Sequence, residues 1–157
     1  MLRVLFSFAL LSLAGLPSTG AATDAAATEP TAVERWEADP TTIFEASEID
    51  ISDFQWLARP VIVFADAAAN PAFEEQLALL QADIDGLVER DVVLITDTDP
   101  DGASGLRTKL RPRGFMLTLI GKDGGVKLRK PFPWDVRELS RTIDKMPMRQ
   151  REIREGQ

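Results

Sequence analysis

The 157-residue chain contains no cysteine, no histidine and no tyrosine. Without cysteine it can form no disulfide bond, no thiolate nucleophile and no cysteine-ligated zinc or iron–sulfur centre. Without histidine it lacks the commonest general base near neutral pH and the commonest metal ligand. These absences exclude thiol redox chemistry and most hydrolase triads, and no cofactor is expected.

The overall composition is that of a globular protein, with 45% hydrophobic and 27% charged residues. A chain of this length can bury one substantial core but is too short for two ordinary domains. The sequence therefore predicts a single α/β domain, whose elements are considered below.

The amino terminus has the features of a secretory signal peptide. Arg3 precedes an apolar run over residues 4–16, and small residues follow at a cleavage site near Ala21 or Ala22. The run is shorter than the roughly 20 apolar residues needed to span a bilayer. We expect a signal peptide over residues 1–21, a flexible leader over 22–41 and the folded domain over 42–157. The protein is then periplasmic or secreted, with no membrane contact after cleavage.

Alternating apolar patterns predict the order of elements in the domain. Residues 61–65 form a continuous apolar strand, and Asn70 with Pro71 forms the start of an amphipathic helix. A second buried strand over 91–96 is followed by a short helix. Strands over 115–120 and 126–130 flank a tight Asp-Gly turn, and a last helix starts at Asp135. The charged tail over 148–157 is expected to fray.

This order resembles the core of thioredoxin, with a central four-stranded mixed sheet (β-α-β, short α, β-β-α) flanked by helices. The stretch "RGFMLTLIGKDGGVKL" is similar to the thioredoxin segment that runs through the third strand and its hairpin. The resemblance implies a reactive CxxC before the first long helix and a cis-proline facing it. Here Ala68 to Pro71 occupies the first position and Met116 the second, so both halves of the redox site are missing.

Three further stretches resemble the bacterial domain-of-unknown-function family 4174, namely "FQWLARPVIVFA", "LIGKDGGVKLR" and "IDKMPMRQRE". Related domains occur in secreted vertebrate matrix proteins of the sushi-repeat type. The resemblance covers residues 45–155 and implies a thioredoxin-like or peroxiredoxin-like fold in an exported protein. It implies no established activity.

The loop "DTDPDG" is the candidate metal site. Asp97, Asp99, Asp101 and Gly102 match positions 1, 3, 5 and 6 of a calcium-binding loop, where carboxylates bind a hard cation. Position 12, however, is Thr108 instead of a bidentate glutamate. The alternative is a solvated loop whose acids cap the following turn.

Charge is divided unevenly along the chain, whose net charge is −7. Residues 22–105 hold 19 acidic and 3 basic side chains, whereas residues 106–157 hold 6 acidic and 14 basic ones. One interpretation is that the two halves neutralise each other in the fold. The other is an anionic ligand or an acidic protein surface bound by Arg107, Lys109, Arg111 and Arg113. Nucleic acid is not expected as a partner of an exported protein with a pI of about 4.7.

Asp66 stands beside the redox position and is the last candidate. A partly buried carboxylate there could act as a general base. The sequence thus predicts an exported, non-catalytic, non-redox thioredoxin-like domain that acts by binding. The alternative is a thiol-independent enzyme or metal-binding protein that uses Asp66 or the aspartate loop.

Overall fold

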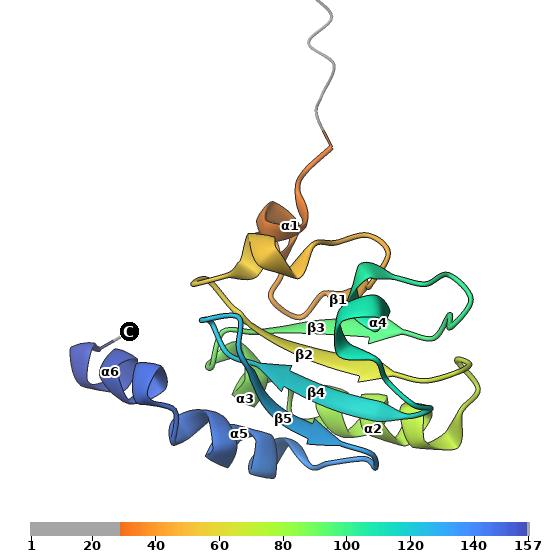
Figure 1. Ribbon diagram of the computed structural model, residues 1–157. Coiled ribbons are helices and arrows are strands. Elements are labelled where there is room, and N and C mark those ends of the chain that lie inside the picture. Colours follow the sequence, from red (N-terminus) through yellow and green to blue (C-terminus); the bar gives the residue numbers. More distant parts are fainter. Residues whose placement is uncertain (1–28, 157) are drawn as a thin grey trace, which may run out of the picture.

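The computed structural model describes residues 29–156, which form a five-stranded mixed sheet between two layers of helices (Figure 1). The strand order is β1-β3-β2-β4-β5. The strands are β1 (Ile43–Glu45), β2 (Arg59–Phe64), β3 (Val92–Asp97), β4 (Met116–Ile120) and β5 (Val126–Lys130). β1 and β2 run parallel to β3, while β4 runs antiparallel to both β2 and β5.

Helices cover both faces of this sheet because the central strands are apolar on both sides. In β2, Val61 and Val63 face a core shared with α2 (Pro71–Ala82), α3 (Ile84–Val88) and α5 (Val136–Asp144). Ile62 and Phe64 face the opposite core, under α1 (Ala32–Ala38), the 3₁₀ helix η1 (Ile51–Phe54) and α4 (Gly105–Leu110). A strand buried on both faces needs the continuous apolar run that the sequence contains.

The start of α2 agrees with its sequence signals. The Asn70 side chain accepts hydrogen bonds from the backbone N–H groups of Ala72 and Phe73, at 3.0 and 3.3 Å. Pro71 occupies the first helical turn, where its missing N–H costs nothing. The single helix expected over this stretch is divided at Asp83, whose backbone leaves the helical region and separates α2 from α3.

Three features correct the sequence expectations. The sheet has five strands instead of four, because the short β1 adds to the edge of β3. The expected flexible leader contains α1, where Thr31 and Glu34 form a capping box. Within that helix, Trp36 packs edge-to-face on Phe54 and donates its indole N–H to the Val92 carbonyl at 3.3 Å. The expected signal peptide over 1–21 lies outside the described residues.

The third correction concerns the carboxyl terminus. The tail that was expected to fray forms α6 (Pro147–Glu155), with Pro147 in its first turn. Only charged residues of this helix are buried, namely Arg149 and Glu152. The helix is therefore attached to the domain mainly by polar contacts, which the next subsection describes.

Candidate functional site

The carboxyl-terminal ends of β2 and β3 form the sheet edge where ligands bind in open α/β folds. The loop from Asp66 to Ala69 leaves this edge fully on the surface and leads into the capped start of α2. Met116 of β4 pairs with Phe64 across the sheet and is buried. Residues 29–156 contain no cis peptide bond. The edge thus lacks both the thiol and the cis-proline of a redox site.

Two residues predicted for different sites pair with each other at this edge. Arg107 Nε donates to Asp97 Oδ1 at 2.6 Å, and the Ser104 hydroxyl donates to Asp97 Oδ2 at 2.5 Å. The Arg107 guanidinium also donates to the carbonyls of Ala65 and Asp97. The two side chains are 10% and 3% exposed. Their charges neutralise each other and join α4 to the ends of β2 and β3, so neither is free to hold a ligand.

In the aspartate loop the three predicted metal ligands do not point to a common centre. Asp99 is exposed, and its Oδ1 accepts hydrogen bonds from the backbone N–H groups of Asp101 and Gly102 at 3.1 and 3.0 Å. Asp101 is exposed and Asp97 is turned inward to Arg107. Within residues 29–156 no three acidic side chains are grouped to hold a metal ion. The Asp99 contacts are those of an Asx turn, and they agree with the alternative of a solvated loop whose acids cap the following turn.

The other three predicted basic residues are exposed. Lys109, Arg111 and Arg113 have no carboxylate oxygen within 4.0 Å in the described part of the chain. Arg111 ends α4 in the left-handed conformation, with φ of +50°. Of the four basic residues predicted to form one binding segment, Arg107 is thus paired with Asp97 inside the fold, and the other three lie on the surface.

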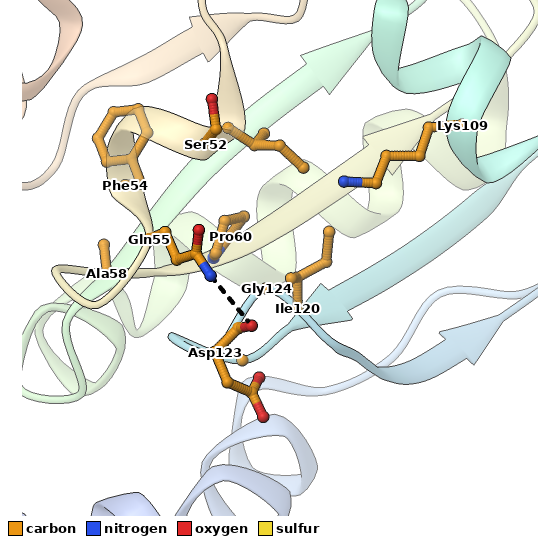
Figure 2. A pocket seen from close by; sticks show the side chains of 11 residues that line it. Ser52, Phe54, Gln55, Ala58, Pro60, Lys109, Ile120, Asp123 and Gly124 are labelled. Atoms are coloured by element: carbon orange, nitrogen blue, oxygen red, sulfur yellow. Dashed lines mark hydrogen bonds between the residues drawn. The ribbon is translucent and has the colours of Figure 1, made fainter.

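Lys109 faces a cavity of about 180 Å³ between η1 and the β4–β5 turn. Figure 2 shows its side chain reaching toward Pro60 and Ile120, across the cavity from Gln55. The Gln55 amide donates to the Asp123 carbonyl at 3.4 Å and holds η1 against the turn. The cavity was not expected from the sequence, because its wall comes from three separate segments, residues 51–60, Lys109 and residues 120–124.

Asp66 does not have the environment that a general base would need. Its side chain is exposed, near Gly114 at the start of β4. The interpretation of Asp66 as a catalytic base required partial burial, so the structure removes the reason for it.

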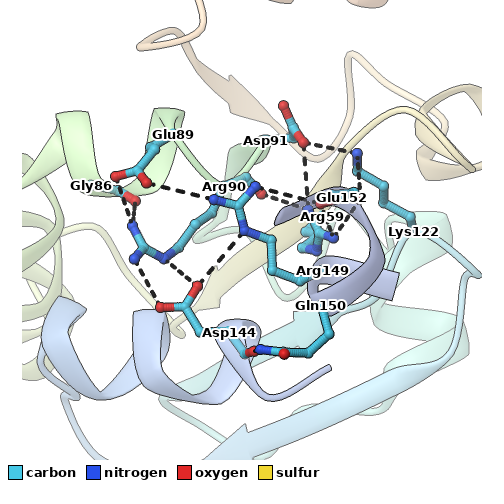
Figure 3. A network of polar contacts seen from close by, with 10 residues as sticks. All are labelled: Arg59, Gly86, Glu89, Arg90, Asp91, Lys122, Asp144, Arg149, Gln150 and Glu152. Carbon is cyan, nitrogen blue, oxygen red and sulfur yellow. Dashed lines mark hydrogen bonds and ion pairs between the residues drawn. The ribbon is translucent and has the colours of Figure 1, made fainter. Parts of the chain in front are cut away.

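A network of ion pairs lies at the opposite end of the sheet (Figure 3). Arg59, which is 1% exposed, donates through one guanidinium nitrogen to both carboxylate oxygens of Glu152 at 2.8 and 2.9 Å. Its other terminal nitrogen donates to the Arg90 carbonyl at 2.8 Å. Lys122 lies 2.8 Å from Asp91 and 3.0 Å from Glu152. These contacts attach α6 to the first residue of β2.

The network continues along α5 and α6. Arg90 forms a bidentate pair with Asp144, with both distances 2.9 Å. Arg149 is 6% exposed and lies 3.5 Å from Glu152 and 3.6 Å from Glu89. Burial raises the pKa of Glu152, but hydrogen bonds from Lys122 and Arg59 outweigh it and hold that pKa below its ordinary value.

The sequence patterns do not predict this network of ion pairs. Arg59 begins a strand that is otherwise apolar, and a charge in that position must be paired if it is buried. Its partner Glu152 lies 93 residues away in a segment with no strong apolar periodicity. The position of Arg59 at the start of a buried strand could therefore have indicated that it is buried. No pattern in the sequence indicated that Glu152 is its partner.

Comparisons with known proteins agree with a thioredoxin-like class of fold. A Plasmodium yoelii peroxiredoxin, Prx1a, modified at its amino terminus and described as forming an artifactual octamer, aligns with a TM-score of 0.50 and 17% identity. The alignment covers 69% of this chain and 83% of that one. Thioredoxin peroxidase I of the same organism and the mitochondrial 2-Cys peroxiredoxin of Plasmodium falciparum align with TM-scores of 0.49 and 0.48, each at 17% identity. Both alignments cover 69% of this chain, and 82% and 85% of theirs.

The family is identified by a match to the family model described as "Domain of unknown function (DUF4174)", over residues 50–152. This chain belongs to that family, as its sequence resemblance implied. No curated protein matches it. Within the described residues, no helix combines the length and apolar character needed to cross a membrane.

Proposed function

We propose that this protein is exported and acts as a non-redox binding module for an anionic partner. The observation that carries the proposal is the group of Lys109, Arg111 and Arg113, which are exposed with no carboxylate within 4.0 Å in the described residues. Arg107 is not part of the binding surface, because Asp97 neutralises it. Unneutralised cations on an acidic protein attract anions locally despite the unfavourable net charge.

The non-redox part of the proposal rests on composition. The chain has no cysteine, and thiolate is the nucleophile of both disulfide exchange and thiol peroxidase chemistry. Export is supported by Arg3 and the apolar run that follows it.

One preparation tests export and binding. The full chain is produced in a Gram-negative host, and the intact mass of the product in the osmotic-shock fraction is measured. We expect a mass shortened by the first 21 or 22 residues, and an unshortened mass would contradict export. The mature product has a net charge of −8 once Arg3 is removed, yet we expect an immobilised heparin column to retain it at low salt.

Paired charge variants separate local binding from net charge. The double variant Arg111→Glu with Arg113→Glu should abolish retention on the heparin column. The double variant Arg137→Glu with Arg154→Glu makes the same charge change elsewhere, and it should keep most of the wild-type retention. Retention should weaken as salt shortens the Debye length to about 8 Å at physiological strength. If the wild type passes through the column unretained, or if both double variants lose retention equally, the anionic-partner proposal is overturned.

A further inference from the structure

Two adjoining cavities lie beside α6, and they contain none of the three exposed cations discussed above. The first has a volume of about 220 Å³ and an apolar wall formed by Met146, Pro147 and Met148. The second has a volume of about 280 Å³ and includes Trp56. The cavities share Lys122, Met148 and Arg151, so they adjoin each other beside the β4–β5 turn and α6, and together they are called the depression.

Trp56 has an unusual conformation for its position. Its φ is +69°, in the left-handed region that bulky residues avoid, and its side chain is 61% exposed. The backbone N–H donates to the Lys122 carbonyl at 2.8 Å, which holds the residue in this conformation. Glycine or asparagine would adopt this backbone more readily. Core burial does not compensate for the strain, and such residues concentrate at binding sites.

Two residues that line the depression, Arg151 and Glu155, have no oppositely charged group within 4.0 Å among residues 29–156. Arg59 and Lys122 are neutralised by Glu152 and Asp91, and Lys127 pairs with Asp123 at 2.6 Å. Arg151 is exposed and has no carboxylate oxygen within 4.0 Å among residues 29–156. Arg151 lines both cavities, as does Met148.

We propose that this depression binds an organic carboxylate with an aromatic or aliphatic body. The ligand's carboxylate pairs with the Arg151 guanidinium, whose planar fork suits two parallel hydrogen bonds. Its apolar body packs against Trp56 and the adaptable methionine side chains. The depression thus combines apolar surface with a guanidinium that can bind an anion, a combination that ligand sites commonly use. The site is independent of the proposed anion-binding surface formed by Lys109, Arg111 and Arg113.

The test uses 3-phenylpropionate as the probe and follows the backbone amide and indole signals by NMR titration. We expect saturable shifts centred on Trp56 and α6, with a dissociation constant of about a millimolar or tighter. The alcohol 3-phenylpropanol lacks the carboxylate, and acetate lacks the apolar body, so neither should saturate over the same range. Equal binding of the alcohol, or shifts spread over the surface without saturation, would overturn the proposal.

Two variants connect the binding to named residues. Arg151→Gln should weaken 3-phenylpropionate about tenfold, the effect of one lost ion pair, whereas Arg154→Gln on the same helix should leave the affinity unchanged. Trp56→Gly should weaken binding while raising the melting temperature, because glycine relieves the positive-φ strain. A structural tryptophan would lower the melting temperature instead. Unchanged affinity in Arg151→Gln, or self-association that covers Trp56 in the free protein, would contradict the assignment.

Discussion

At the scale of single residues, the pair of Arg59 and Glu152 is the most informative feature of this protein. Both side chains are almost completely withdrawn from water, at 1% and 10% exposure. A buried ion pair adds little net stability over an apolar pair, but removal of one partner leaves the other charge buried and unpaired. Two hydrogen bonds to Glu152 and the carboxylate of Asp91, 3.5 Å away, compensate for the desolvation of Arg59, while Lys122 gives Glu152 a second cationic partner.

Glu152→Gln should therefore lower the free energy of unfolding by about 3 kcal/mol. The neutral amide keeps the shape of the side chain but no longer balances the charge of Arg59. Glu155→Gln, at an exposed position of the same helix, should change it by less than about 0.5 kcal/mol. Urea denaturation of the three proteins measures both values, and equal effects of the two variants would contradict the assigned role of Glu152.

The same pair predicts a pH dependence. Because the pKa of Glu152 in the folded state lies below its ordinary value of 4.5, its ionised form is favoured by folding. The contribution is complete above the unfolded-state pKa and is lost as pH falls through the folded-state pKa. The stability difference between wild type and Glu152→Gln should thus narrow from about pH 6 to about pH 3. A constant difference over this range would show that the carboxylate charge does not contribute.

At the scale of elements, the Asp97–Arg107 pair explains the position of α4. Ser104 caps the helix by accepting the Arg107 N–H at 3.0 Å, and its hydroxyl donates in turn to Asp97. The Arg107 guanidinium also lies over the Phe64 ring, 5.6 Å from its centroid. One helix is thereby attached to two strands through a buried charged pair, which gives Asp97 a structural role.

Two variants distinguish a structural role of Asp97 from a role of the aspartate loop in binding a cation. Asp97→Asn should lower the free energy of unfolding by about 2 kcal/mol, because it weakens charged hydrogen bonds to buried partners. Asp101→Asn, in the exposed part of the loop, should change it by less than about 0.5 kcal/mol. Thermal denaturation with and without calcium completes the comparison. A melting temperature that rises with micromolar calcium, and no longer does so in Asp101→Asn, would restore the loop as a cation site.

At the scale of the whole molecule, part of the uneven charge of the sequence is neutralised inside the fold. Among the described residues, five ion pairs join residues 22–105 to residues 106–157, namely Arg59–Glu152, Arg90–Asp144, Asp97–Arg107, Asp91–Lys122 and Glu89–Arg149. In the last three the acid belongs to the acidic part and the base to the basic part, whereas the first two pairs have the opposite arrangement. Mutual neutralisation of the two parts therefore accounts for only some of the charge, and Lys109, Arg111 and Arg113 are among the basic residues without a carboxylate within 4.0 Å in the described part of the chain.

The whole domain should also be inactive in thiol chemistry. Neither insulin reduction nor peroxide consumption should exceed the buffer blank, because no residue of the chain can supply a thiolate. The assays require protein free of host reductases, and an authentic thioredoxin and peroxiredoxin serve as positive controls. Turnover that copurifies with the domain through successive columns would contradict the non-redox proposal.

The sequence by itself determined the local elements and the class of fold. Continuous apolar runs predict β2 and β3, Asn70-Pro71 predicts the start of α2, and the Asp-Gly pair predicts the β4–β5 hairpin. Each of these signals acts over a few residues, through burial, capping or turn geometry. The absence of cysteine likewise determines which chemistry the chain lacks, whatever its fold.

Only the tertiary structure decided which charges are paired and which are free. Arg107 and Arg111 look equivalent in the sequence, yet one is enclosed by Asp97 and the other ends α4 in solvent. Glu152 is buried because β2 presents Arg59 to it across the fold, and α6 forms where the local pattern indicated a frayed tail. Ion pairs over such separations depend on how the helices pack on the sheet, and that packing leaves no periodic signal in the sequence around either partner.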